Sequence, residues 1–255
     1  MLIHSASQLL TLAGGPQRGR DLGRLGLIEN GAVLMRGEKI VETGSTPDLL
    51  RKYPNEEHLD AHGRVVMPGF VDPHTHLVWA GDRAAEFEMR LQGKTYMEIM
   101  SAGGGINATV EATRRASQTE LLAQTRERAE EMFRHGTTTA EAKTGYGLEL
   151  ESELRQMQVL LDLDAEGPLE IVPTFLAAHA IPPEYKGRAD EYTHLICKQM
   201  LPEVKNWWGL NSRGKPLPFV DVFCENNAFD LAQTRFILET AKSLGFPLKL
   251  HVDEF

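Results

Sequence analysis

The chain has 255 residues, of which 42% are hydrophobic and 25% are charged, and its formal net charge is -9. This length and composition are typical of a globular protein with one large domain and a substantial buried core. The negative charge disfavours binding to nucleic acid or to an anionic membrane surface, so neither is expected as a partner.

The two cysteines, Cys197 and Cys224, lie far apart and form no C-x-x-C motif. That pattern suits a reducing compartment and offers neither a disulfide framework nor a thiolate metal site. No apolar run approaches the roughly 18 residues that a membrane span needs, and the N-terminus lacks the features of a secretory signal. We therefore expect a cytoplasmic location.

Short apolar runs separated by turn residues characterise residues 1–64. Asn30-Gly31 and Arg36-Gly37 fall between such runs at hairpin spacing, which predicts a small antiparallel sheet. Residues 48–53 fit a single helical turn. We expect this segment to form a β-rich layer that precedes the main domain, residues 65–255.

From Val65 onward, expected strands alternate with expected helices. The strands are expected over 65–76, 137–142, 170–178, 219–224 and 248–252. The helices are expected over 118–135, 154–161, 190–201 with a continuation after Pro202, and 230–244. Such an order indicates parallel βαβ units, which a barrel and a doubly wound sheet share. No glycine-rich nucleotide-binding motif follows any of these strands, which disfavours nucleotide binding.

The first of these strands ends in His74-Thr75-His76. Side chains alternate faces along a strand, so both imidazoles project the same way, with Cα atoms roughly 6.6 Å apart. Two imidazoles at that spacing can converge on one metal ion. The alternative is a chance pair of loop histidines, because H-x-H alone is weakly specific. Ligands from other strands decide between the two.

Polar side chains follow the other expected strands as well. They are Lys143 and Tyr146, then His179, then Glu225 and Asn226, and finally His251 and Glu254, while Arg83 follows the histidine pair. The carboxyl ends of barrel strands meet at one face, where active sites are built, and this placement favours the barrel. His251 is then the expected third metal ligand, ahead of its alternative as a hydrogen-bonded core histidine.

Glu254 lies three residues beyond His251 and within reach of a water molecule activated by a metal. A metal can lower the pKa of water from 15.7 to about 7, and a neighbouring carboxylate can pass a proton to a leaving nitrogen. Attack on an amide or amidine carbon is the chemistry expected. Glu254 as a solvated loop residue is the alternative, and position alone leaves both open.

At this point several segments resemble a known family. P-G-F-V-D-P-H-T-H at 68–76 resembles the first-strand signature of the amidohydrolase superfamily. The more specific segments resemble the imidazolonepropionases: H-L-V-W-A-G-D-R at 76–83, S-A-G-G-G-I at 101–106, G-T-T-T-A-E-A-K-T-G-Y-G at 136–147, A-A-H-A-I-P-P-E-Y at 177–185 and H-V-D-E at 251–254. The resemblance extends from about residue 20 to the last residue.

The resemblance implies a TIM (β/α)8 barrel of the metal-dependent hydrolase type, here with only about the first five β/α units. Residues 1–64 would be the N-terminal portion of a composite β-sandwich domain, and residues 65–255 the partial catalytic barrel. The implied reaction is hydrolysis of the cyclic C–N bond of 4-imidazolone-5-propanoate to N-formimidoyl-L-glutamate, in histidine degradation. Relatives are commonly homodimers.

By position, the resemblance also implies site residues. His74, His76 and His251 match ligands of one divalent metal, Zn or Fe, and Glu254 matches the residue that handles the nucleophilic water. The substrate contacts would be Arg83, which would hold the propanoate carboxylate, Tyr96, Tyr146 and His179. Tyr96 on its own could only pack against neighbouring methionines.

Alternatives stay open. Relatives with two metals use a carboxylated lysine on the fourth strand, and residues 219–225 contain no lysine, which favours one metal. Another mononuclear amidohydrolase or a deaminase would share the ligands, although Arg83 and the Lys143–Gly147 segment favour an acidic substrate. The alternative from another class is a catalytically inactive truncated or scaffold form.

The family pattern also includes three further βα units, with a His after the sixth strand and a metal-binding Asp after the eighth, which would lie beyond Phe255. We therefore expect residues 1–255 alone not to hydrolyse 4-imidazolone-5-propanoate, because the metal lacks a ligand. The measurement is substrate turnover by the purified chain. A rate comparable to that of a full-length relative would contradict this expectation.

Overall fold

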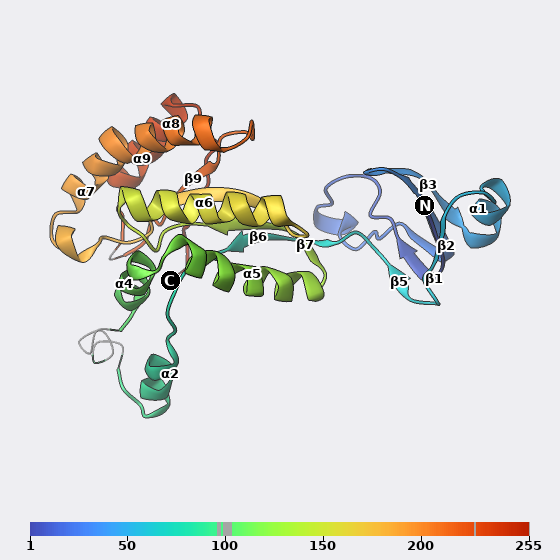
Figure 1. Cartoon of the computed structure of the whole chain (residues 1–255), viewed down its shortest axis with the longest axis horizontal. Helices are drawn as coiled ribbons and strands as arrows, with labels where there is room; N and C mark the ends of the chain where they lie inside the picture. Colours follow the sequence, from blue (N-terminus) through green and yellow to red (C-terminus); the bar gives the residue numbers. More distant parts are fainter. Residues whose placement is uncertain (96–97, 99–103, 227, 255) are drawn as a thin grey trace. The chain divides into compact units, whose positions relative to one another are not determined.

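The structure, a computed structural model, describes residues 1–95, 98, 104–226 and 228–254. The chain divides into two compact units, Met1–Gly69 and Phe70–Phe255, whose elements are labelled in Figure 1. Within the described residues, no helix is both long and apolar enough to cross a membrane.

The first unit is built on a mixed sheet. Its strands are β1 (Leu2–Leu10), β2 (Leu27–Arg36), β3 (Lys39–Ser45), β4 (His58–Asp60) and β5 (Val65–Val66). The sheet order is β3-β2-β1-β4, with β5 also pairing with β1. The β1–β2 and β2–β3 pairs are antiparallel, whereas β4 and β5 run parallel to β1. The expected small antiparallel sheet therefore accounts for three of these strands.

One of the two expected turns in this unit is wrong. Arg36 pairs with Lys39 at the hairpin between β2 and β3, as expected. Asn30-Gly31, however, lies within β2, where Gly31 pairs with Ala6. A Cβ on Gly31 would lie 2.5 Å from Leu9 Cβ, so this glycine allows close strand contact instead of a turn. The helix α1 (Thr46–Lys52) is longer than the expected single turn and begins after the Ser45 cap.

The apolar run that precedes the histidine pair is divided between two sheets. Val65–Val66 forms β5 of the first sheet, and the first barrel strand, β6, spans Phe70–Thr75. The intervening Met67-Pro68-Gly69 breaks the run because proline has no backbone N–H to donate to a ladder. The single strand that the sequence predicts from Val65 is therefore two strands.

The second unit contains a parallel sheet in the order β6-β7-β8-β9. The strands after β6 are β7 (Thr137–Lys143), β8 (Glu170–Ala178) and β9 (Phe219–Val222). All three neighbouring pairs are parallel, for example Ala142 opposite Pro173. Consecutive parallel strands joined by helices match the βαβ units expected from the sequence.

The segment expected as a fifth strand, 248–252, forms two isolated parallel bridges to β9 instead of a regular strand. They join Val220 to Leu248 and Phe223 to His251. His251 N donates to Val222 O at 3.0 Å, so the segment still follows the edge of β9. This places His251 beside the sheet at the end that carries the histidine pair.

The helices of the second unit are α2 (Ala84–Leu91), α4 (Ile106–Arg115), α5 (Gln118–Arg134), α6 (Leu150–Glu166), α7 (Ala189–Leu195), α8 (Leu201–Asn211) and α9 (Leu231–Ser243). The expected capping box of Ser117 with Glu120 is present at α5, and Asp230 with Gln233 forms another at α9. A π-helical segment, Ile196–Met200, joins α7 to α8. Pro202 lies in the first turn of α8, directly after this π-helical segment, and the helical path continues through it.

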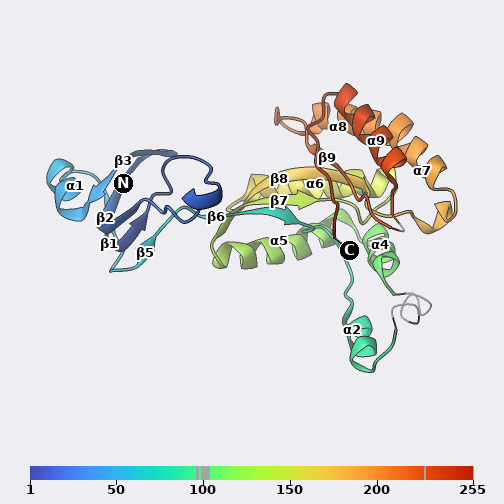
Figure 2. The same ribbon diagram turned by 180° about the vertical axis from the view of Figure 1, so that it is seen from behind.

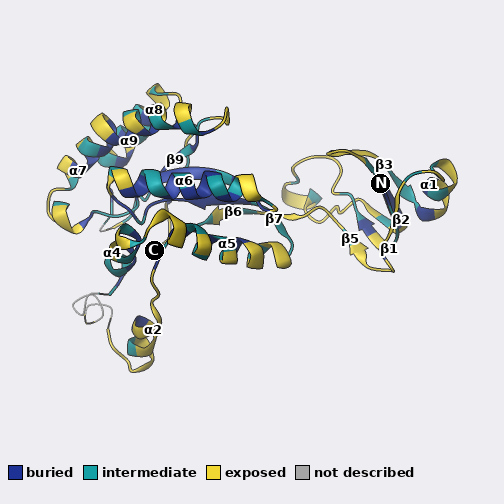
Figure 3. Ribbon diagram, viewed as in Figure 1, coloured by how far each residue is buried: buried dark blue, intermediate teal, exposed yellow. Residues whose placement is uncertain are grey.

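The helices of the second unit pack against its parallel sheet. Figures 1 and 2 both show α5 and α6 lying side by side along the strands, with α7, α8 and α9 grouped near β9. The buried face of α6, visible in Figure 3, packs Met157, Leu160 and Leu163 into one core cluster. A second cluster around Phe175, Tyr192 and Phe229 holds α7 and α9 against β8 and β9.

Candidate metal and active site

The histidine pair lies where β6 ends. His74 is the second-last residue of β6, and His76 directly follows Thr75, the last residue of the strand. Their ring centroids are 5.6 Å apart, as expected for alternate residues that project to one side. Thr75 faces the other way, and its hydroxyl donates to Glu141 O at 2.6 Å. The hydrogen bond anchors the strand end that presents both imidazoles.

His251 joins the pair from a segment 175 or more positions further along the chain. Its Nε2 lies 2.8 Å from His74 Nε2, and its ring centroid lies 5.7 Å from that of His76. Ligand nitrogens from all three residues lie within 4.8 Å of one another. His251 is buried, His76 is intermediate and His74 is exposed, so the cluster opens toward solvent at His74.

A buried carboxylate orients His251. Asp221, on β9, is 2% exposed, and its Oδ2 lies 2.6 Å from His251 Nδ1. With Nδ1–H donating to the carboxylate, Nε2 presents its lone pair to the cluster. Burial alone would raise the pKa of Asp221, but the hydrogen bonds from His251 and Lys143 outweigh it and lower that pKa.

The donor set fits a divalent transition metal. Burial lowers the pKa of His74, with His251 adding to the effect, and lowers the pKa of His76 to about 2. Both rings are therefore uncharged at neutral pH and offer lone pairs. Two imidazole nitrogens only 2.8 Å apart need a shared proton or a cation between them. A set of three imidazole nitrogens suits several divalent transition metals.

His179 and Tyr146 lie against the cluster. The His179 ring stacks on His76 at a centroid distance of 4.7 Å and an interplanar angle of 16°. Tyr146 lies 5.7 Å from the His76 ring and 5.3 Å from the His179 ring. Burial lowers the pKa of His179 to about 4 and raises the pKa of the Tyr146 phenol. Two of the expected substrate contacts are thus brought together with the three expected ligands.

Arg83 pairs with a buried carboxylate. It is the residue before α2, and its Nε is 3.2 Å from Glu86 Oε1. Glu86 is buried and also accepts a hydrogen bond from Gly105 N at 2.7 Å. The guanidinium is close enough to Tyr146 for its charge to act against the burial-driven rise of the phenol pKa. Its side chain is 46% exposed.

Glu254 is exposed, and the structure does not bring its carboxylate into the cluster. Its backbone N donates to Glu225 Oε1 at 3.0 Å, which ties the chain after His251 to the chain after β9. Among the described residues its carboxylate has no hydrogen bond or ion pair. Tyr96, the remaining expected contact, lies outside the described residues.

A buried network of charges beneath the rings was not expected from the sequence. Lys143 Nζ lies 2.6 Å from Glu141 Oε1 and 2.8 Å from Asp221 Oδ2, and all three side chains are at most 4% exposed. Lys249 Nζ lies 3.2 Å from Glu141 Oε1, and Thr174 donates its hydroxyl to the same oxygen. We call these four charged residues the ion network.

A signal for the ion network exists in the strand sequences. Glu141 and Lys143 are the charged residues of a strand otherwise made of threonine and alanine, and they lie two positions apart, so they share one face of β7. Asp221 likewise interrupts the apolar strand Phe219–Val222. Because Lys143 is paired with two carboxylates, its charge is not left for a substrate. The argument for an acidic substrate therefore depends on Arg83, which is paired with Glu86 but keeps 46% of its side chain exposed.

The chain is similar in sequence to known proteins. Residues 57–115 match the amidohydrolase family, and residues 31–55 match the imidazolonepropionase-like composite domain of bacteria. The chain is 54% identical to the imidazolonepropionase of Chloroflexus aggregans, covering 100% of this chain and 61% of that protein. It is 46% identical to that of Herpetosiphon aurantiacus, covering 100% and 59%. The chain thus spans about 60% of the length of these relatives.

Solved structures share the fold at low identity. The 5-methylcytosine deaminase of Klebsiella pneumoniae, liganded with phosphonocytosine, matches with a TM-score of 0.61 and 16% identity over 100% of this chain and 52% of that chain. The aminofutalosine deaminase of Helicobacter pylori matches with a TM-score of 0.58 and 16% identity over 98% and 50%. The expected partial (β/α)8 barrel of the metal-dependent hydrolase type is confirmed.

Lys143→Met tests the ion network. We expect it to lower the free energy of unfolding by about 3–5 kcal/mol at neutral pH, because two buried carboxylates lose their shared cation. The pKa of Asp221 is lowered in the folded state, so its hydrogen-bonded ion pair stabilises the fold at pH values above the unfolded pKa, about 3.9. This stabilisation is lost as the pH falls through the folded pKa. Urea denaturation from pH 7 down to pH 3 measures both effects.

The matched control is Lys205→Met, at an exposed position of α8. It should change the free energy of unfolding by about 0.5 kcal/mol or less. Equal losses in the two variants would contradict a structural role for the buried ion network.

Proposed function

The chain belongs to the imidazolonepropionase family of the amidohydrolases, and on this premise we propose that its site hydrolyses the cyclic C–N bond of 4-imidazolone-5-propanoate. The product is N-formimidoyl-L-glutamate, as in histidine degradation. The observation that carries the proposal is the convergence of His74, His76 and His251, from two distant segments, beside Tyr146 and His179.

The three imidazoles would hold one divalent metal, Zn or Fe. When bound, such a metal polarises a carbonyl and lowers the pKa of water. Burial favours the neutral form of His74 and His76, and Asp221 fixes the Nε2 lone pair of His251. Those are the two conditions that an imidazole must meet to act as a ligand.

The remaining residues bind the substrate and move protons. Water attacks the ring carbonyl carbon, the C–N bond breaks, and the released nitrogen takes a proton. Glu254 is the proposed base that accepts the proton of the attacking water and returns it to that nitrogen. Arg83 would pair with the propanoate carboxylate, while Tyr96, Tyr146 and His179 contact the ring. The site would have to draw Glu254 toward the imidazoles, since its carboxylate is exposed in this structure.

His179 has a defined hydrogen-bonding role in this scheme. Its Nδ1 lies 2.9 Å from Gly145 O, and a carbonyl oxygen accepts only. Nδ1 therefore carries the proton. Because burial keeps the ring neutral, Nε2 is left as an acceptor for an N–H or O–H group of the substrate. The substrate we propose has ring nitrogen that can supply such a donor.

We also propose the setting of the protein. A cytoplasmic location is supported by the two distant free cysteines, Cys197 and Cys224. The first unit is proposed as part of a composite β-sandwich domain, and the second as part of the catalytic barrel. A homodimer stays a prediction from the resemblance, and light scattering after size-exclusion chromatography would test it.

Metal binding by the imidazoles is testable without turnover. After dialysis against Zn2+ and removal of free ions, we expect about one ion per chain and its loss in His251→Ala, because His74 and His76 alone provide only two nitrogens. Elemental analysis measures the stoichiometry. His135→Ala, which removes an exposed histidine at the end of α5, should leave it unchanged. Retention of the ion by His251→Ala would overturn the ligand assignment.

Turnover tests the reaction itself, in a protein that carries all eight barrel strands. We expect loss of 4-imidazolone-5-propanoate with formation of N-formimidoyl-L-glutamate. Glu254→Gln should lower kcat by roughly 10²–10⁴-fold with little change in KM, because it removes proton transfer and not binding. Glu239→Gln, an exposed position on α9, is the matched control. A metal-loaded protein without turnover would favour the inactive scaffold.

A further inference from the structure

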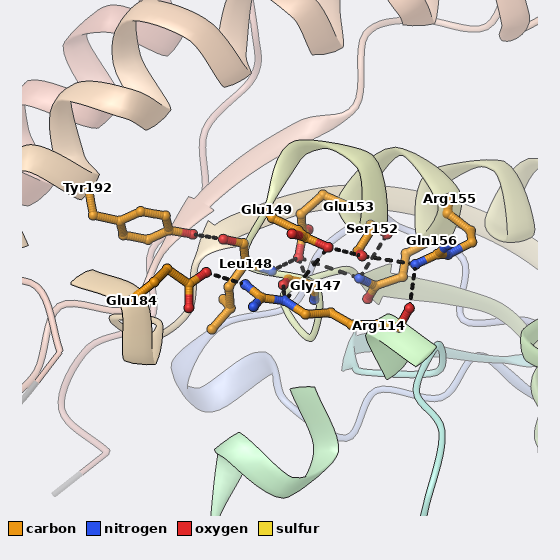
Figure 4. Close-up of polar contacts among 10 residues, drawn as sticks. All are labelled: Arg114, Gly147, Leu148, Glu149, Ser152, Glu153, Arg155, Gln156, Glu184 and Tyr192. Carbon is orange, nitrogen blue, oxygen red and sulfur yellow. Dashed lines mark hydrogen bonds and ion pairs between the residues drawn. The ribbon is translucent and has the colours of Figure 1, made fainter. Parts of the chain in front are cut away.

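The loop that joins β7 to α6 presents Tyr146 to the rings of His76 and His179. Figure 4 shows the side chains of Glu153, Arg114 and Tyr192 bonded to Gly147 and Leu148 of this loop. The carboxylate of Glu153, which is 0% exposed, accepts hydrogen bonds from Gly145 N at 3.1 Å, Gly147 N at 2.8 Å and Leu148 N at 2.8 Å. Burial raises the pKa of Glu153, while the three amides and the nearby Thr144 hydroxyl favour its carboxylate form.

The carbonyl groups of the same loop are bonded too. Arg114 Nε donates to Gly147 O at 2.6 Å, and Tyr192 Oη donates to Leu148 O at 3.0 Å. Gly145 O accepts from His179 Nδ1 at 2.9 Å. Gly145 therefore links the two side chains, because its N–H donates to Glu153 and its carbonyl oxygen accepts from His179.

Glu153 does not cap its own helix. A capping side chain bonds the first free amides of the helix that it starts, and α6 begins at Leu150. The amides that Glu153 accepts belong to Gly145, Gly147 and Leu148, all of which precede the helix. The carboxylate thus shapes the loop and not the helix end.

The glycines of the loop fit this close approach. Gly145 has a φ of +109°, and a Cβ there would lie 2.8 Å from Leu176 O and 2.9 Å from His179 Nδ1. A Cβ on Gly147 would lie 2.8 Å from Glu153 N. A side chain on Gly145 would push the loop away from β8 and His179, and one on Gly147 would push it away from the helix that carries Glu153.

We propose that Glu153 is a positioning residue: through the amides of the Gly145–Leu148 loop it fixes Tyr146 and sets the Nδ1–H form of His179. The role of these two side chains as substrate contacts rests on the proposed function. Glu153 does not touch the substrate. It acts by holding the Gly145 carbonyl where His179 must donate to it.

The test compares wild type with Glu153→Gln in the chain of 255 residues, without metal or substrate. In wild type we expect the ring ¹⁵N shifts of His179 to report a protonated Nδ1 and an unprotonated Nε2. In Glu153→Gln we expect the amides of Gly145, Gly147 and Leu148 to exchange roughly 10- to 100-fold faster, because a neutral amide replaces an acceptor of charge-assisted bonds. The His179 signals should move toward a mixture of the two ring forms.

The control is Glu151→Gln, which makes the same charge change at an exposed position in the same turn of α6. It should leave the three amides and the His179 signals as in wild type. Glu153→Asp keeps the charge but shortens the side chain, and we expect partial protection of the amides and recovery of the His179 signature. A general loss of the fold would instead accelerate exchange throughout α6.

Two results overturn the proposal. One is a wild-type His179 that carries its proton on Nε2, a measurement that needs no variant to fold. The other is unchanged loop exchange and unchanged His179 signals in Glu153→Gln. Neither readout involves turnover, so an inactive but metal-loaded eight-strand protein would refute the proposed reaction alone, while normal turnover with an unaffected loop would refute this inference alone.

Discussion

The candidate site depends on charge compensation around one buried carboxylate. Asp221 contacts Lys143 Nζ on one side and His251 Nδ1 on the other, at 2.8 and 2.6 Å. A carboxylate this far from water is stable only when it is paired and hydrogen-bonded, and both partners satisfy it. The same contacts that remove the cost of burial also orient the imidazole of His251. The contacts of Asp221 therefore both stabilise the strand ends and orient His251 as a ligand.

Burial has a second consequence in the imidazoles themselves. It disfavours the imidazolium form, so the rings of His76 and His179 keep lone pairs far below neutral pH. Neutral rings can pack closely, as the stacked His76 and His179 do, without the repulsion that charged rings would suffer. His251 and His179 each have one nitrogen bonded to a neighbour, Asp221 and Gly145 respectively, and the other nitrogen left for a ligand or substrate.

Local signals in the sequence predicted most of the elements. The capping box at Ser117 and the stop at Gly136 bound α5, and the apolar strand Glu170–Ala178 was expected with its observed ends. The errors have physical reasons. Asn30-Gly31 has the composition of a turn but serves strand contact, and Pro68 divides a run that otherwise looks continuous. Turn and strand propensities are local, whereas both of these cases were decided by which strands pair with each other.

The sequence by itself determined which chemistry is present: an H-x-H pair at a strand end, a third histidine in another expected strand, and motifs that resemble one family from about residue 20 to the last residue. It also placed those residues at the carboxyl ends of parallel strands, because strand and helix periods are written in the chain. Only the tertiary structure decided which groups meet. It showed that Lys143 is paired with Glu141 and Asp221, and that Glu153 accepts hydrogen bonds from a loop that precedes its helix. It also showed that the Glu254 carboxylate stays exposed. Residues such as Lys143 and Asp221 are 78 positions apart, and their contact follows from sheet order and register, which no local pattern encodes.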